Sequence, residues 1–286
     1  MGTDLKALRL GQLRRGVVFL YGSEFADIDA DRIGLSSGTT RASCASSAAD
    51  YKPTAYVPTG AWRAPGEREL ALLRGEFGQD GNWVRVVRIP SNLLSEFEAV
   101  RRSIAEASSL SEARAAAVCP LSEIVLKRLA TWTIDEGESL AGAGISVNLP
   151  GLPTVTDDQA DGRFLGLHLD TWYHSAHQAR SASPSRISIN LGYENRYFLY
   201  ANLCLADMQS ALELTGNSRD VSSNQSPRSF YATFPRYPIV RLRVGPGEAY
   251  IAPTENISHD GSSMGQTRWD ASFVIRGQFC ANDWAE

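Results

Sequence analysis

Eight short segments with β-like character follow one another in the second half of the chain, and they limit the folds that it can adopt. Each is rich in β-branched or aromatic residues, and turn signals such as Gly245-Pro246-Gly247 separate them. The segments span 144–150, 163–172, 185–193, 196–205, 230–234, 239–244, 248–253 and 269–279. Strands this short and this closely spaced are typical of a sandwich or a jelly-roll barrel.

The first half has a different pattern. Residues 16–22 form a buried strand pattern, whereas 67–77 and 91–108 have the apolar spacing of amphipathic helices. Ser109 and Glu112 have capping-box spacing, which predicts another helix after them. We therefore expect an α+β, β-dominated single domain over 1–286. Residues 1–137 would give mainly helical support with one or two strands, and 138–286 a jelly-roll, cupin-like core.

Composition excludes several classes of protein. The 286 residues are 43% hydrophobic and 21% charged, with a net charge of −4 and no basic stripe, so nucleic acid is not an expected partner. No apolar stretch is long enough to cross a membrane, and the N-terminus lacks the apolar run of a signal peptide. The four cysteines are scattered without a CxxC pair, which predicts reduced thiols in a cytoplasmic protein.

Two polar residues interrupt the apolar segment RFLGLHLDTW, and they suggest a metal site. His168 and Asp170 are two apart, so in a strand their side chains project from the same face. Between Asp170 and His259 lie 88 residues (259 − 170 − 1), and an early and a late strand of a barrel can be neighbours. Two imidazoles and one carboxylate form a facial triad that leaves three coordination positions open, which favours non-haem Fe(II) and oxygen chemistry.

Such chemistry needs an electron source, for which a 2-oxo acid is suitable. Its distal carboxylate requires a cation, and the planar fork of arginine binds carboxylates in a bidentate manner. The segment TRWDASFVIRG supplies Arg268 and Arg276, and both share strand parity with Ser272. All three can therefore face the same side of a strand.

The HxD motif, the distal histidine and an arginine near a serine, across a predicted jelly roll, together resemble the Fe(II)/2-oxoglutarate-dependent oxygenase superfamily. The phytanoyl-CoA dioxygenase-like, taurine dioxygenase-like and small-molecule tailoring branches all stay open. The resemblance implies iron ligation by His168, Asp170 and His259. It also implies 2-oxoglutarate binding by Arg268 with Ser272, although the departure from the common Arg-x-Ser spacing keeps Arg276 as an alternative.

The resemblance further implies O2 as co-substrate and hydroxylation of an unactivated C–H bond in a polar small molecule, with release of succinate and CO2. Desaturation, epimerisation and cyclisation are alternatives at the same iron. Asp170 argues against halogenation, because related halogenases have Gly or Ala at this position. A non-enzymatic jelly-roll binding module and a cupin-like metalloenzyme are the competing classes.

Several residues near the motif admit two interpretations. Trp172, His174 and His177 are candidates for substrate contact, although core packing for Trp172 and a solvated loop for the histidines are the simpler interpretations. Asp260 is a turn residue or an orienting partner for the imidazole next to it. The polar segments 34–62 and 215–229 are candidate lids.

Overall fold

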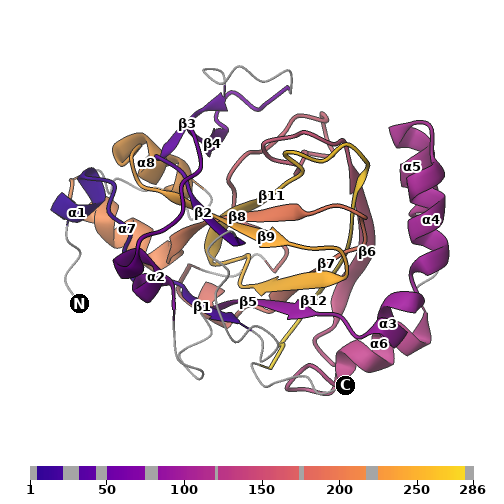
Figure 1. The fold of residues 1–286 in the computed structure, drawn as a ribbon. Coiled ribbons are helices and arrows are strands. Elements are labelled where there is room, and N and C mark those ends of the chain that lie inside the picture. Colours follow the sequence, from indigo (N-terminus) through magenta and orange to yellow (C-terminus); the bar gives the residue numbers. More distant parts are fainter. Residues whose placement is uncertain are drawn as a thin grey trace.

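Two stacked β-sheets form the centre of the structure, which is a computed structural model (Figure 1). It describes residues 5–21, 32–42, 50–74, 83–119, 122–173, 177–216 and 225–280. The chain is a β-rich α+β protein in which most strand pairs are antiparallel, and within these ranges no sheet closes on itself. The structure therefore shows two facing sheets but not the expected jelly-roll barrel.

The larger sheet has six strands. Their order is β1 (Val18–Tyr21), β5 (Trp83–Arg88), β10 (Glu248–Ala252), β7 (Ser185–Asn190), β12 (Asp270–Gly277) and β6 (Ala141–Asn148). Only β1 and β5 are parallel. Within the described residues, β6 therefore lies at one edge of this sheet and pairs only with β12.

The smaller sheet faces the inner side of the larger one. Its order is β11 (Ile257–Ser262), β8 (Arg196–Cys204), β9 (Ile239–Val244) and β2 (Ile33–Leu35), and a separate pair is formed by β3 (Thr39–Arg41) and β4 (Tyr56–Pro58). Alternate residues of both sheets meet in one apolar core, because strand side chains point to opposite faces in turn. Members of this core include Val84, Val86 and Tyr250 from the larger sheet and Phe198, Tyr200 and Leu242 from the smaller sheet.

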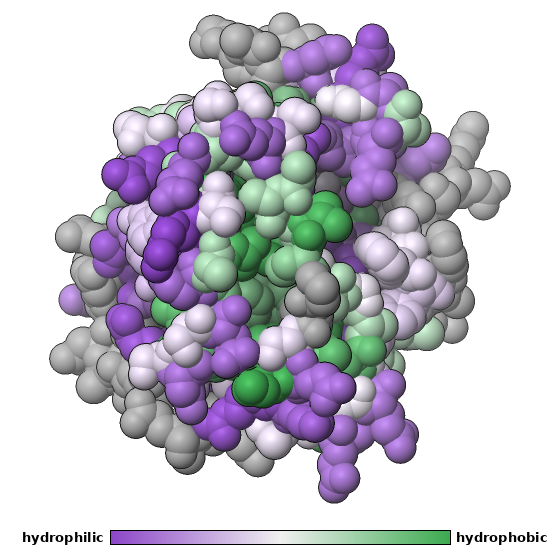
Figure 2. Space-filling view, turned by 90° about the vertical axis from the view of Figure 1, so that its right-hand side faces the viewer, coloured by the Kyte–Doolittle hydropathy of each residue, from purple (hydrophilic) through white to green (hydrophobic). Residues whose placement is uncertain are grey.

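Helices from the first half cover the outer face of the larger sheet. They are α3 (Ser91–Ser95), α4 (Glu98–Glu106), α5 (Leu110–Ala116) and α6 (Glu123–Ala130). Ile187, Phe273 and Ile275 from the sheet pack against Phe97 and Ile104. The expected cap at Ser109 is confirmed, since its side chain accepts a hydrogen bond from the backbone N–H of Glu112 at 3.2 Å. Figure 2 turns this side of the molecule to the viewer, and apolar side chains gather in the middle of a hydrophilic rim.

A second group of helices covers the outer face of the smaller sheet. It consists of α1 (Leu5–Arg9), α7 (Leu205–Glu213) and α8 (Ser226–Thr233). The remaining helices are α2 (Glu67–Leu73) and the 3-10 helix η3 (His177–Ala182). Among the described residues, no helix has both the length and the apolar character needed to cross a membrane.

Four sequence expectations need correction. The described part of the first half has five strands, β1 to β5, and not one or two, and three of them lie within the expected loop 34–62 or overlap it. Residues 230–233 belong to the helix α8, and Phe234 caps it. Pro227 stands in the first turn, and the buried residues Ser226, Pro227, Phe230 and Tyr231 recur with helical spacing and not with the alternation of a strand. Residues 163–172 form single bridges at Phe164 and His168 in place of a continuous strand. The strand β11, which carries His259, lacks the apolar pattern that would have predicted it.

Candidate metal centre

A backbone bridge between His168 and His259 holds the centre of the site. The N–H of His168 donates to the carbonyl of His259 at 3.0 Å, and the N–H of His259 donates to the carbonyl of His168 at 2.8 Å. This reciprocal pair is the hydrogen-bonded pair of an antiparallel ladder. The two histidines are therefore placed side by side by their backbones, and their ring centroids are 4.9 Å apart.

The segment around His168 keeps the alternation of a strand over a few residues only. Gly166 has φ +66°, and a Cβ at this position would lie 2.4 Å from the carbonyl oxygen of Tyr56, so glycine allows both the turn and the close approach. After it, Leu167 and Leu169 are buried, whereas His168 and Asp170 face the other way. The expected common face of His168 and Asp170 is thus present without a continuous strand.

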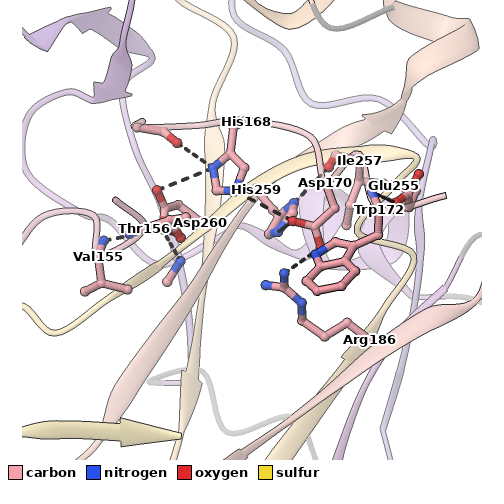
Figure 3. Close-up of polar contacts among 12 residues, drawn as sticks. Val155, Thr156, His168, Asp170, Trp172, Arg186, Glu255, Ile257, His259 and Asp260 are labelled. Carbon is pink, nitrogen blue, oxygen red and sulfur yellow. Dashed lines mark hydrogen bonds and ion pairs between the residues drawn. The ribbon is translucent and has the colours of Figure 1, made fainter. Parts of the chain in front are cut away.

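Three donor atoms converge between the two sheets (Figure 3). Oδ1 of Asp170 lies 3.8 Å from Nε2 of His168 and 3.8 Å from Nε2 of His259. One ligand atom from each residue lies within 4.8 Å of the others. All three side chains are largely shielded from solvent, since that of His168 is 12% exposed, that of Asp170 6% and that of His259 1%.

The other nitrogen of each ring is already engaged. Nδ1 of His168 lies 2.8 Å from the carbonyl oxygen of Gly166, and Nδ1 of His259 lies 3.1 Å from that of Ile257. A carbonyl accepts only, so each Nδ1 carries the proton and each Nε2 keeps a lone pair in the neutral ring. Nε2 of His259 is buried without a hydrogen-bond partner among the described residues. The donor set and this unsatisfied atom fit a divalent metal ion.

Burial and charge set the protonation states. Burial lowers the pKa of His259 to about 3, so this imidazole is neutral at pH 7. Burial opposes ionisation of Asp170, but Arg186, both histidines and Arg276 outweigh it and hold the pKa of this carboxyl far below its usual range. For His168, burial lowers the pKa, yet contact with Asp260 raises it above its ordinary value. A metal ion would have to displace any proton on this ring.

Two arginines hold the second oxygen of Asp170. Nη2 of Arg186 lies 2.6 Å from Oδ2, and Nη2 of Arg276 lies 3.1 Å from it. Oδ1 is thereby left to face the imidazoles. Sequence reasoning missed Arg186, although a signal exists: Arg186, Ser188 and Asn190 alternate with buried isoleucines along β7, so polar residues fill the inner face of a central strand.

Asp260 lies behind His168 and not behind its sequence neighbour His259. Its Oδ1 accepts hydrogen bonds from the backbone N–H groups of Val155, Thr156 and Gly261 and from the Thr156 hydroxyl, at 2.7 to 3.3 Å. Its Oδ2 lies 3.6 Å from Nδ1 of His168. The carboxylate is fully buried, and Figure 3 shows it on the side of His168 away from Asp170.

The backbone beyond Asp170 is fixed by a second pair of buried charged residues. The guanidinium of Arg180 donates to the carbonyls of Asp170 and Glu255 at 3.1 and 3.0 Å. The carboxylate of Glu255 accepts from the N–H groups of Trp172 and Tyr173 at 2.6 and 3.2 Å. These contacts join the segment after Asp170 to the turn before β11. The segment that carries Asp170 and the strand that carries His259 are therefore held to each other.

The other predicted residues are placed as follows. Arg268 is exposed, and its backbone N–H donates to Glu194, so the structure does not bring it to the histidines. Ser272 is buried on β12, opposite Asn190 and Ser146. The alternative, Arg276, lies at the centre, and its guanidinium carbon is 4.3 Å from the ring centroid of the exposed Trp172. His174 lies outside the described residues, and of His177 only the backbone is described.

Two comparisons with known proteins, one with protein families and one with curated proteins, found no relative. The candidate site therefore rests on its own geometry, namely a buried His-Asp-His group that can bind a metal ion.

Proposed function

We propose that this protein is a non-haem Fe(II)- and 2-oxoglutarate-dependent oxygenase. The observation that carries the proposal is the convergence of Nε2 of His168, Nε2 of His259 and Oδ1 of Asp170 in a shielded position between two sheets. The two facing sheets support an open double-stranded β-helix as the scaffold. Substrate oxidation by hydroxylation follows from the same resemblance, and a ligating Asp170 argues against halogenation.

The ligand set favours iron over a structural zinc ion. Because two arginines hold Oδ2 of Asp170, its carboxylate offers one oxygen only. The chain thus supplies three donors, whereas a structural zinc site is closed by four. Two histidines and one carboxylate with open positions suit Fe(II), which when bound would supply oxygen activation and chelation of a 2-oxo acid.

The charges of the site favour a dianionic co-substrate. At neutral pH, the guanidinium groups of Arg186 and Arg276 balance the carboxylates of Asp170 and Asp260. A divalent ion would then leave two uncompensated positive charges in a buried place, which is costly. A dicarboxylate such as 2-oxoglutarate restores neutrality.

Arg276 is the residue that we assign to the distal carboxylate. It is buried on the inner face of β12, and its Nε has no hydrogen-bond partner among the described residues. The guanidinium therefore keeps a donor for a carboxylate in addition to its contact with Asp170. Arg186 has a similarly unpartnered Nε, but its shorter contact with Asp170 makes it the residue that fixes the ligand.

An anaerobic binding experiment tests the proposal. Fe(II) and 2-oxoglutarate are added to the purified protein, and we expect a weak visible charge-transfer band that disappears in the His259→Ala variant. Asp50→Ala serves as the control and should keep the band, because Asp50 is exposed and pairs with Arg163 on the surface. Absence of the band in the unaltered protein, together with no substrate-independent succinate formation under air, would rule out the proposed function.

A further inference from the structure

Among the residues that the structure describes, the outer edge of β6 has no partner strand. The carbonyl of Ala271 on β12 points toward β7, since it accepts hydrogen bonds from the N–H groups of Leu191 and Gly192. Backbone groups of successive strand residues point to opposite sides, so those of the next residue, Ser272, point toward Ser146 on β6. In an antiparallel ladder this alternation continues, and the N–H and C=O groups of Ile145 and Val147 consequently point away from the sheet. The guanidinium of Arg114 donates to the Val147 carbonyl at 3.2 Å, which agrees with this direction.

A cleft of about 560 Å³ runs along this edge. Five consecutive residues, Gly144 to Asn148, line it, so the cleft follows the edge of the strand and does not sit over one face only. Five residues of an extended strand span about 17 Å. Asp157 and Gln159 form the opposite wall, and the volume lies within the range of about 300–1,000 Å³ that ligand sites have.

The sequence of β6 does not protect its edge. AGAGISVN contains no charged residue and no proline, whereas exposed edge strands usually carry such residues to prevent pairing with other chains. Residues 141–144 and Ser146 are exposed. An edge of this kind is suited to β-strand addition, in which an extended peptide supplies the missing hydrogen bonds.

Two glycines connect the cleft to the candidate metal centre. Val274 lines the cleft and precedes Arg276 by two residues, so both lie on the inner face of β12, about 7 Å apart along the strand. A Cβ on Gly144 would meet nothing within 4 Å. A Cβ on Gly142 would lie 3.1 Å from Nη1 of Arg276 and 3.7 Å from the Trp172 ring. The inner side of β6 is therefore bare where it faces the residues around Asp170.

We propose that the substrate is a peptide segment that adds to the edge of β6 as a further strand. The N–H and C=O groups of Ile145 and the N–H group of Val147 would bind its backbone, since the Val147 carbonyl already accepts from Arg114, which also pairs with Asp157 at that end of the cleft. A side chain on the inner face would pass over Gly142 and Gly144 toward the metal centre. The role of this peptide as substrate rests on the proposed oxygenase function, but its binding does not. The geometry selects an extended backbone, because a compact molecule cannot satisfy donors and acceptors spaced along a strand.

Hydrogen–deuterium exchange measures this binding without turnover. The protein with Fe(II) and 2-oxoglutarate is kept under nitrogen, and a library of capped hexapeptides is the probe. We expect at least tenfold slower exchange at the amides of Ile145 and Val147, and no change at Ser146, which already faces β12. Two sets of peptides, N-methylated at odd or at even positions, distinguish the two edges of the bound peptide. Only the set whose methyl groups point toward β6 should fail to slow exchange.

Each other outcome has a defined meaning. If the iron–2-oxoglutarate band forms but no peptide slows exchange at Ile145, strand addition is overturned and the proposed function stands. If free amino acids slow exchange over 144–148 as strongly as the hexapeptides do, the cleft binds a compact molecule and the inference is wrong. Peptide protection without the band would support strand addition and count against the oxygenase.

Discussion

Oδ2 of Asp170 lies 2.6 Å from Nη2 of Arg186, and this buried contact fixes which oxygen of the carboxylate faces the two histidines. A free carboxylate can rotate and offer either oxygen or both to a metal. Here Arg186, assisted by Arg276, holds one oxygen and leaves the other directed at the imidazoles. The arginine thus orients the candidate ligand from the opposite side of the site.

Removal of this arginine should destabilise the protein. In Arg186→Met we expect a loss of about 1–3 kcal/mol in the free energy of unfolding, because a buried carboxylate loses one of its two cationic partners. Arg163→Met is the matched control, since Arg163 pairs with Asp50 on the surface and its removal should change stability by less than about 0.5 kcal/mol. Urea unfolding of the metal-free variants measures the free energy of unfolding of each. Equal losses in Arg186→Met and Arg163→Met would show that the buried ion pair stabilises the fold no more than the surface pair does.

The two arginines suggested by the sequence should differ in co-substrate binding. Arg276→Ala should weaken 2-oxoglutarate binding by roughly 10- to 100-fold, as expected for a lost charge-assisted hydrogen bond. Arg268→Ala should leave binding unchanged, because Arg268 is exposed and not among the residues around Asp170. Titration of the charge-transfer band in each variant compares them. If Arg268→Ala and not Arg276→Ala weakened 2-oxoglutarate binding, Arg268 would be the residue that binds the distal carboxylate.

Asp260 should affect the metal through His168. In Asp260→Asn we expect Fe(II) affinity to fall by roughly 10- to 100-fold, which is the usual effect of removing a partner that orients a ligating histidine. Asp157→Asn is the control, since Asp157 is partly exposed and pairs with Arg114 instead. Calorimetric titration with Fe(II) under nitrogen gives both affinities. Unchanged affinity in Asp260→Asn, with the fold intact by circular dichroism, would limit Asp260 to a structural contact.

The metal-free protein should lose stability in mild acid because of His259. Burial lowers the folded-state pKa of this residue to about 3, whereas its ordinary value is 6.5. Between these values the unfolded chain binds the proton and the folded chain does not, so stability falls as pH decreases. Relative to His259→Gln, the unaltered protein should lose about 2 kcal/mol between pH 6.5 and pH 5. Unfolding curves at several pH values test this, and parallel pH profiles for the two proteins would contradict it.

Periodicity predicted the elements whose residues repeat regularly. The strands β7, β8, β9, β10 and β12 and the helices α2 and α5 follow the expected patterns, because each buries an apolar face. The helix expected over 91–108 is present as two helices, α3 and α4. β11 could not be predicted in this way. Its residues ISHDGS are all buried, but most of them are polar, so an apolar alternation is absent.

The candidate ligands were predictable, but their surroundings were not. The chain has only four histidines, and His168 and Asp170 are two residues apart, so the three candidate ligands could be singled out; the structure brings them together. The partners of Asp170 depend on which strands become neighbours: Arg186 and Arg276 are opposite each other only through the pairing of β7 with β12. Strand order is a tertiary property, and a single sequence does not encode it in any local pattern.

The backbone bridge between His168 and His259 also has a consequence for how the protein folds. It closes a loop of 91 residues (259 − 168), so the two imidazoles meet only after a long-range contact has formed. Loop closure over such a distance has a high entropic cost, and contacts of this range slow folding. In a chain emerging from the ribosome, the candidate metal centre therefore forms only after β11 has been synthesised and docked. Under the proposed function, iron binding would thus report that this long-range contact has formed.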